Sequence, residues 1–590
     1  MIESVYKIGK LIGKFNKEAY AKEYDDNVEA NYVITIDFDK KGEFKRVDQE
    51  KFSKGKLSKY FYKKAKGRNP PSYSPTLNLN KKDVRKTLNN LRKILKKIKV
   101  NLENAQEKEI VNNIIKHLES KDLEEEIKKM SSGKDIKDIL TIRIDDQYVG
   151  EIDFLRKAIA KIVSYEGRNS LGTGICSLCL EEKQVSGDIS PYTFYTIDKP
   201  GYITGGFDEK KAYKNFPLCY DCKRYIELGK EEIKKELKFK IRESLVYYLI
   251  PDFTLDLIDD EKMKRVYDIL FEKSISDLKL ENEQYDHLIS QEGTLEYILK
   301  ETQDILINFL FLEEINNAQI INLYVQDIYP SRLKEMFEIK YLVESILPKE
   351  KSSFTYSTMY NFFSDEKKYF LELIDKTFKA IKLDDEQLFI YFLLKRIREF
   401  LLNDKPYKYV IQDAYRIFLF VKLTTKEVIM EKEDVKKITD AKSIREFVES
   451  LPALDSPAKR ALFLMGVLTE HVLLAQYKDK KSKHFMKKLN GLKMNATDMV
   501  GLLPEIRNKL EEYDEYSPNV AEIFLEASKN FSEVKTLVKT LEEMSIELNF
   551  YFVLGMGMYD DIAKKFIFAK KEENHEKQAW VFICLRRFLG

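Results

Sequence analysis

Residues 33–39 read Val33-Ile34-Thr35-Ile36-Asp37-Phe38-Asp39, and apolar and polar side chains alternate along them. An alternation with a period of two predicts a half-buried β-strand, here with Ile34, Ile36 and Phe38 facing a core. Residues 140–145, Leu-Thr-Ile-Arg-Ile-Asp, repeat the pattern. The sequence therefore predicts a sheet in the N-terminal region.

Helical patterns lie between these two strands and dominate the second half of the chain. Apolar residues step by four and three and predict one buried stripe on a helix at Val84, Leu88, Leu91, Leu95 and Ile98. Residues 353–402 show the same period, and Ser456-Pro457 is typical of a capped helix start, with the helix running to about Tyr477. A further long helix is expected to end before Pro251.

The chain has 590 residues, whereas one domain usually has about 100–200, so several domains are expected. We predict an α+β multidomain protein that is predominantly α. Its expected parts are a mixed N-terminal domain with a sheet (1–165), an inserted zinc-ribbon-like module with four cysteine ligands (171–230), a mainly helical middle domain (231–404) and a C-terminal helical bundle (405–590). The segment after about Met430 is expected to fold independently.

Composition restricts the class of protein. Hydrophobic residues make up 44% and charged residues 34%, as in folded proteins without long disordered tracts. The most apolar stretch, residues 550–558, has about half of the roughly 20 residues that a membrane span needs, and the N-terminus lacks a signal-peptide pattern. Five cysteines do not form a secreted disulfide framework. A cytoplasmic protein without a membrane partner is expected.

Four of the cysteines form two C-x-x-C pairs, Cys176/Cys179 and Cys219/Cys222, separated by 39 residues. Each pair can present two thiolates to one tetrahedral ion. Thiolates without histidine favour zinc or an iron–sulfur centre, and paired knuckles flanking strand-like segments resemble a zinc ribbon more than a cluster ferredoxin. Four protein ligands leave no open position, so the predicted zinc is structural. The long segment between the pairs is expected to form a hairpin through residues 192–197 and 202–207. A redox pair or four buried thiols are the alternatives.

Catalytic motifs are scarce. The five histidines have no metal-ligand spacing, and neither a P-loop nor a G-x-S-x-G motif is present. The best candidate is Asp37 with Asp39, joined by Asp145 or Asp146, because paired carboxylates can hold two magnesium ions for phosphodiester cleavage. However, the alternation places Asp37 and Asp39 on one polar strand face, which we interpret as a solvated edge. We therefore expect no enzymatic activity.

Charge is unevenly distributed although the net charge is only +3. Residues 40–100 carry 21 Lys/Arg and four Asp/Glu, and residues 252–314 carry six and 17. Within residues 51–68, Tyr60, Phe61 and Tyr62 are interleaved with cations and could stack on unpaired bases. Residues 478–488 hold six lysines that predict sequence-independent phosphate contacts or, alternatively, a solvated loop: Lys478, Lys480, Lys481, Lys483, Lys487 and Lys488.

Six segments follow one another between about residues 175 and 500: GICSLCLEEKQVSGD, DKPGYITGGF, FPLCYDCKRYIELGK, YYLIPDF, YPSRLKE and FLMGVLTEHVLLAQYKDKKSKHFMKKLNGLKMN. In this order they resemble a known family, the large subunit of the type I-B CRISPR surveillance complex, Cascade.

The resemblance implies a non-catalytic subunit in antiviral defence. Such a subunit binds the end of the CRISPR guide RNA, helps to recognise the protospacer-adjacent motif in target double-stranded DNA, and stabilises the opened DNA. Its implied partners are the other Cascade subunits and a recruited helicase-nuclease that cuts the DNA. The C-terminal helical part is similar to the small subunit of related complexes.

Two other classes of function stay open from the residues. One is a magnesium-dependent nuclease that uses Asp37 and Asp39. The other is a zinc-ribbon transcription or RNA-processing factor. Magnesium-dependent cleavage would identify the first, and co-purification of a uniform short RNA with partner subunits separates the CRISPR function from the second.

Overall fold

A computed structural model describes residues 1–568 apart from residues 17–23, 26–27, 65–71, 132, 134–135, 166–169, 188–191, 193, 195–208, 243–244, 254–259, 269–304, 316–317, 347–353 and 404. The chain divides into two compact units. The first comprises Met1–Glu232, Leu255–Tyr267 and Asn316–Gln319, and the second comprises Ile233–Thr254, Asp268–Ile315 and Ile320–Gly590.

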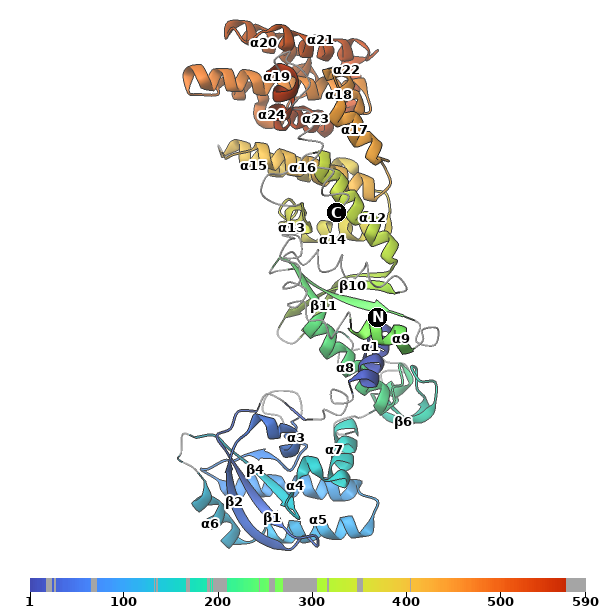
Figure 1. The fold of residues 1–590 in the computed structure, drawn as a ribbon, viewed down its shortest axis with the longest axis vertical. Coiled ribbons are helices and arrows are strands. Elements are labelled where there is room, and N and C mark those ends of the chain that lie inside the picture. Colours follow the sequence, from blue (N-terminus) through green and yellow to red (C-terminus); the bar gives the residue numbers. More distant parts are fainter. Residues whose placement is uncertain are drawn as a thin grey trace. The chain divides into compact units, whose positions relative to one another are not determined.

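The N-terminal part of the first unit contains the predicted sheet (Figure 1). Its strand order is β2-β1-β4-β3, with β5 paired to β4. The strands are β1 (Tyr32–Phe38), β2 (Phe44–Lys51), β3 (Leu77–Asn78), β4 (Asp138–Ile144) and β5 (Gln147–Tyr148). β1 runs antiparallel to β2 and parallel to β4, so β1 is an interior strand. Both strands read from the sequence alternation are confirmed.

Helices cover one face of this sheet. They are α4 (Val84–Asn101), α5 (Ala105–His117), α6 (Lys121–Met130) and α7 (Asp153–Tyr165). Ile34, Ile36 and Phe38 are fully buried against them, as the alternation predicts. The five apolar residues of the predicted stripe on α4 are also fully buried. The short elements η1 (Lys54–Lys56), α3 (Leu57–Tyr60) and η2 (Val149–Glu151) complete this part.

The remaining elements of the first unit are the N-terminal helix, the elements around the two cysteine pairs, and one later helix that packs on the N-terminal helix. They are α1 (Ile2–Phe15), the antiparallel hairpin β6 (Leu171–Ile175) and β7 (Glu182–Ser186), η3 (Glu209–Lys214), α8 (Tyr220–Glu236) and α9 (Asp260–Tyr267). The hairpin expected through residues 192–207 lies almost wholly outside the described residues.

The second unit contains a four-stranded sheet that the sequence analysis missed. Its order is β11-β10-β9-β8, with β8 (Lys238–Arg242), β9 (Leu245–Asp252), β10 (Leu306–Ile315) and β11 (Ala318–Ile328). The long helix expected before Pro251 is wrong, because α8 ends at Glu236 and Pro251 lies inside β9. Pro251 is tolerated there because it pairs only with Ile307 of β10, beyond the end of β8. A continuous apolar run does not distinguish a strand from a buried helix.

Helices form the rest of the second unit, as predicted for residues 353–402 and for the helix after Ser456 (Figure 1). They are α12 (Pro330–Ile346), α13 (Tyr356–Tyr360), α14 (Lys367–Lys379), α15 (Glu386–Leu402), α16 (Lys408–Thr424), α17 (Lys432–Asp440), α18 (Ile444–Ser450), α19 (Pro457–Lys480), η5 (His484–Leu492), α20 (Ala496–Glu512), α21 (Pro518–Ser532), α22 (Leu537–Met544), α23 (Ile546–Gly557), α24 (Tyr559–Ile562) and the π-helical turn η6 (Ala563–Ile567).

Helix α19 lies at the centre of the C-terminal helices and packs against α20, α21, α22, α23 and α24. Ser456 caps it, because its Oγ accepts a hydrogen bond from the backbone N–H of Lys459. The crossing with α23 is close enough to require glycine on both helices. A Cβ on Gly466 would lie 1.8 Å from the Phe552 carbonyl oxygen, and one on Gly555 would lie 1.8 Å from that of Phe463.

Contacts cross residue 430, near which the independently folding segment is expected to begin. Phe418 of α16 packs against Phe550 of α23 with ring centroids 5.1 Å apart. The Tyr407 hydroxyl donates to Oε2 of the buried Glu470 at 2.8 Å. Independent folding of the segment after Met430 stays a prediction, but a fragment that begins there loses both of these partners.

No helix in the described part of the chain combines the length and the apolar character needed to cross a membrane.

We predict that Gly466→Ala lowers the free energy of unfolding by about 2–3 kcal/mol, because the added methyl group forces the α19 and α23 backbones apart. Gly501→Ala is the matched control. Gly501 is exposed inside α20, and nothing lies within 4 Å of the added Cβ, so helix propensity should leave stability unchanged or raise it by up to ~1 kcal/mol. Denaturant titration of both variants checks this, and equal effects would contradict the proposed packing constraint.

Candidate functional site

The first cysteine pair sits in the turn between β6 and β7. The backbone N–H of Cys176 donates to the Glu181 carbonyl at 2.9 Å, and the N–H of Leu180 donates to the Cys176 carbonyl at 3.0 Å. Leu180 adopts a positive φ of 60° to close the turn. This tight loop directs the Cys176 and Cys179 sulfurs to the same side.

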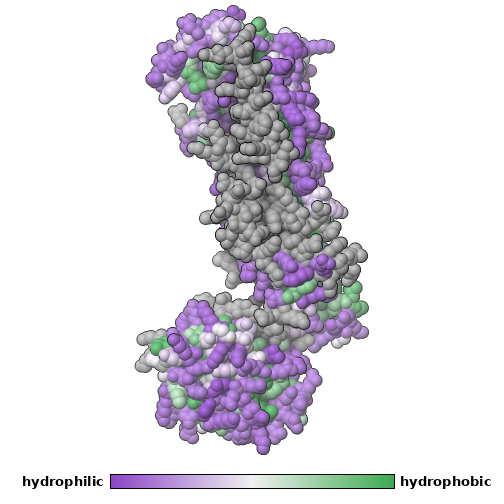
Figure 2. Space-filling view, in the orientation of Figure 1, coloured by the Kyte–Doolittle hydropathy of each residue, from purple (hydrophilic) through white to green (hydrophobic). Residues whose placement is uncertain are grey.

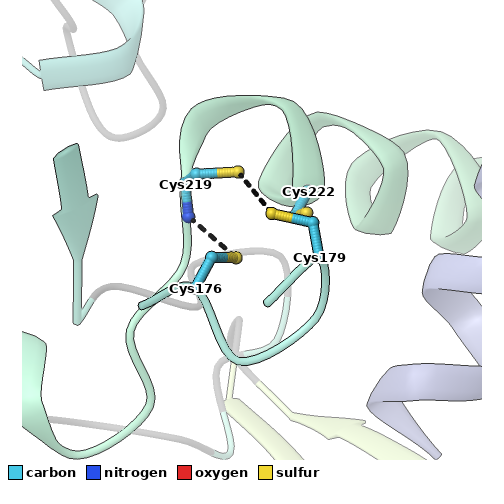
Figure 3. A group of neighbouring side chains, drawn as sticks. All are labelled: Cys176, Cys179, Cys219 and Cys222. Atoms are coloured by element: carbon cyan, nitrogen blue, oxygen red, sulfur yellow. Dashed lines mark hydrogen bonds between the residues drawn. The ribbon is translucent and has the colours of Figure 1, made fainter. Parts of the chain in front are cut away.

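The second pair lies at the start of α8. Cys219 directly precedes the helix, and Cys222 belongs to its first turn. A backbone bridge between Ser186, at the end of β7, and Leu218 brings the two pairs together. The Cys219 N–H then donates to the Cys176 sulfur at 3.4 Å (Figure 3).

The four sulfurs form one compact group. All four lie within 4.8 Å of one another, and the Sγ atoms of Cys179 and Cys219 are 3.8 Å apart (Figure 3). Tetrahedral zinc with Zn–S bonds of about 2.3 Å requires sulfurs ~3.8 Å apart. Cys179 is partly exposed and the other three are buried. Among the described residues, these four cysteines form a group whose ligand atoms are close enough together to hold a metal ion.

Electrostatics in the group favour a cation. A hydrogen bond from Cys222 lowers the pKa of Cys219 to about 5, which makes this thiol easy to ionise. The same hydrogen bond, together with burial, raises the pKa of Cys222, and burial raises that of Cys179. The cluster therefore accepts one negative charge readily, and further thiolates need a positive ion among them.

Tyr6 of α1 is a neighbour of this group that the sequence analysis missed. Its side chain is 8% exposed and donates a hydrogen bond to Cys222, and burial, followed by the charge of Cys222, raises the pKa of Tyr6. α1 can pack this closely on α8 because a Cβ on Gly9 would lie 1.8 Å from the Tyr225 carbonyl oxygen, and one on Gly229 would lie 2.1 Å from that of Val5. The amphipathic pattern of residues 2–15 was the available signal for a packed helix.

Asp37 does not lie on a solvated edge, and that part of the interpretation is wrong. β1 is an interior strand, and the Asp37 residue is only 1% exposed. In the register of the sheet, Arg46 on β2 and Arg143 on β4 both stand opposite Asp37. Arg143 donates from Nε to Oδ1 at 2.7 Å and from its terminal nitrogen to Oδ2 at 2.6 Å, and Arg46 donates to Oδ2 at 3.2 Å.

The other candidate carboxylates serve turns. Asp39 accepts hydrogen bonds from the backbone N–H groups of Lys41 and Glu43, both at 2.8 Å. Asp145 and Asp146 form the two-residue turn between β4 and β5, both with positive φ, as Asp allows in such turns. Asp39 thus has backbone partners, and Asp145 and Asp146 close a turn through their backbone conformation.

The aromatic residues expected to stack on unpaired bases are core residues instead. Tyr60, Phe61 and Tyr62 are 0%, 2% and 5% exposed. Tyr60 packs edge-on against Tyr148 and stacks with Phe52. The hypothesis of a base-stacking surface at these residues is therefore wrong, because an aromatic side chain that fills a core has no free face.

Among the six lysines of residues 478–488, Lys483 differs from the others because its side chain has partners within the fold. It is partly buried, donates to the Tyr407 hydroxyl at 3.0 Å and lies 3.7 Å from Oε1 of Glu470. The other five are exposed. Lys488 pairs with Glu505 at 3.1 Å.

The other exposed lysines have more distant acidic partners, a hydroxyl partner, or no acidic partner among the described residues. Lys478 lies 3.9 Å from Glu515. Lys480 donates to the Tyr513 hydroxyl at 3.1 Å. Lys481 and Lys487 have no acidic partner among the described residues.

We predict that Asp37→Asn lowers the free energy of unfolding at neutral pH by roughly 2–4 kcal/mol, because it leaves buried arginine charge uncompensated. Burial raises the pKa of Asp37, but hydrogen bonds and charge from Arg143 outweigh it, so the pKa lies below the ordinary 3.8. The contribution is thus complete above the unfolded-state pKa and is lost as pH falls through the folded-state value. The difference between the two proteins should be constant above about pH 5 and shrink in acid.

Asp39→Asn is the control for this experiment. Asp39 is exposed on its turn, so its replacement should cost about 1 kcal/mol or less. Denaturant titration across pH measures both variants. An Asp37→Asn protein as stable as the wild type would contradict the structural role of this carboxylate.

Comparison with known protein families finds three matches in order along the chain. They are the N-terminal, central and C-terminal domains of the CRISPR-associated protein TM1802 (cas_TM1802), which match residues 1–161, 173–328 and 354–574. The matched segments cover most of the chain. A search of curated proteins finds no match.

Proposed function

The chain belongs to the CRISPR-associated TM1802 family, and from this premise we propose that it is the large, non-catalytic subunit of a type I-B CRISPR surveillance complex. The ordered match of all three domains of a CRISPR-associated protein carries the proposal. In this role the chain binds the end of the guide RNA, contributes to recognition of the protospacer-adjacent motif, and stabilises the opened DNA. Its partners are the other subunits and a recruited helicase-nuclease in the cytoplasm.

Two observations support a role without catalysis. Asp37, the better placed of the candidate carboxylates, is buried and paired with two arginines. The four cysteine sulfurs converge as a complete ligand set, and a metal with four protein ligands offers no position for an activated water. The phosphodiester chemistry then belongs to another component.

We predict that the chain, purified from its native host, carries a uniform short RNA and other CRISPR-associated subunits. It should also leave single- and double-stranded nucleic acid intact in the presence of magnesium. RNA sequencing, mass spectrometry and gel assays provide the readouts. Absence of both RNA and partner subunits would contradict the assembly role, and magnesium-dependent cleavage abolished by Asp39→Asn would establish the nuclease instead.

We also propose that Cys176, Cys179, Cys219 and Cys222 hold one structural zinc ion. The separation of 3.8 Å between the Cys179 and Cys219 sulfurs suits a tetrahedral site, and thiolate ligands select zinc among the common divalent ions. The ion neutralises the thiolates and fastens the β6–β7 turn to the start of α8.

We expect one equivalent of zinc per chain in elemental analysis. Cys219→Ser should lose the metal and make the module sensitive to protease, because one ligand and its charge are removed. Ser177→Ala, within the same turn but without a ligand atom, is the control that should retain both. A Cys219→Ser protein with full metal content and unchanged protease resistance would refute the site.

The exposed lysines of residues 478–488 are proposed to contact nucleic-acid phosphates. Changing Lys478, Lys480, Lys481, Lys487 and Lys488 together to Gln should flatten the salt dependence of binding by up to about 0.9 per lost duplex contact or 0.7 per lost single-strand contact. Lys483→Gln is kept separate because Lys483 also supports Tyr407 and Glu470. Unchanged affinity and salt dependence would assign the segment to a solvated loop.

A further inference from the structure

Helix α4 has many positively charged side chains, and the proposed function assigns no role to them. Its 18 residues include seven Lys or Arg and no Asp or Glu. Its apolar side is buried against the sheet, so most of this charge stands on the opposite side. The nearby α6 has both signs, with four acidic and three basic residues in ten. The composition of α4 is therefore not that of an ordinary solvated helix.

Six of the seven positive side chains of α4 fall into two groups. Arg85, Arg92 and Lys99 are partly buried, and each donates to a group on α5 or on the turn that follows it. In contrast, Lys86, Lys93 and Lys96 are exposed and have no ion pair or side-chain hydrogen bond among the described residues. We call Lys86, Lys93 and Lys96 the outer lysines of α4. Their ammonium groups are free to bind an external anion.

The spacing of the outer lysines suits an extended anionic ligand. From Lys86 to Lys96 the helix rises about 15 Å at 1.5 Å per residue. Over that length, double-stranded DNA presents about nine phosphate charges, at one per ~1.7 Å of its axis. Packing against the sheet fixes the helix, so the lysines form a stiff row. The visible face of this N-terminal part is mostly hydrophilic (Figure 2).

A double strand fits this row better than an unpaired strand. Proteins that bind single strands combine cations with exposed aromatic side chains on which bases stack. α4 contains no aromatic residue, and the nearby Tyr60, Phe61 and Tyr62 are buried. Lysine supplies point charges without planar contacts to base edges, which suits the backbone of a duplex.

We propose that the outer lysines of α4 bind the phosphate backbone of double-stranded DNA without reading its sequence. This inference rests on the proposed function, since it names the surface on which the N-terminal part of a surveillance subunit meets target DNA before it opens. The row contributes affinity and orientation. Recognition of a DNA motif is left to other residues.

The test is equilibrium binding of the full-length protein to a fluorescent duplex of about 30 base pairs across a range of salt concentrations. A variant with Lys86→Gln, Lys93→Gln and Lys96→Gln should bind at least about tenfold more weakly at about 0.1 M salt, and its salt slope should fall by about 2–3. Both effects should be the same for duplexes of unrelated sequence. Thermal unfolding should be unchanged because these side chains have no partners within the described part of the fold.

The matched control changes Lys128, Lys129 and Lys137 to Gln. These lysines are exposed in the same part of the chain, and two of them pair with acidic residues, Lys128 with Glu124 and Lys137 with Glu29. The control removes the same net charge and should change the slope by less than one. An equal effect of both variants would overturn the proposal in favour of a general charge effect.

Two further outcomes would also overturn it. An unchanged duplex affinity would remove α4 from DNA binding, and an equal loss for single-stranded RNA of the same length would make the ligand the guide rather than the duplex. Neither result touches the proposed function, because co-purification of RNA and partner subunits is measured independently on the wild-type protein.

Discussion

Contact between helix backbones through paired glycines is the constraint on which two helix pairs of this protein depend, one in each unit. Gly466 and Gly555 let α19 and α23 touch, and Gly9 and Gly229 do the same for α1 and α8. α19 is buried around most of its circumference because it packs against α20, α21, α22 and α24 as well as α23. The contact between α1 and α8 brings Tyr6 to the four-cysteine cluster, so the surroundings of this cluster depend on a helix that lies far from it in sequence.

Two buried carboxylates, Asp37 in the first unit and Glu470 in the second, have partners that are fixed by the fold. Asp37 stands between two arginines in the register of the sheet, and Glu470 receives a hydrogen bond from Tyr407 and lies near Lys483. A buried ion is costly unless its partners are fixed, so each of these residues is committed to the fold. This explains why residue types that suggest chemistry in a sequence can have structural roles. Free cations are then found where the helix composition is one-sided, as on α4.

Local periodicity predicted many of the helices and strands. It did not predict which strands pair or which side chains meet when they lie far apart in the sequence. The strand at residues 33–39, the stripe of α4 and the cap at Ser456 depend on neighbours within a few residues. The position of β1 inside the sheet depends on β4, which lies far along the chain, so the sequence could not reveal that Asp37 is buried. Likewise, spacing identified the four cysteines, whereas the contact with Tyr6 needed the fold.

The cysteines, the acidic residues and the lysines have different roles because each type of side chain binds a different kind of partner. Four cysteine sulfurs this close together can hold a metal ion, and an ion held by four thiolates stabilises the segments that supply them. Carboxylates used inside the fold to neutralise arginines are no longer free to bind magnesium. Lysine at the surface attracts phosphate but performs no phosphodiester chemistry by itself. These roles are consistent with the proposal that the chain holds nucleic acid in place while another component cuts it.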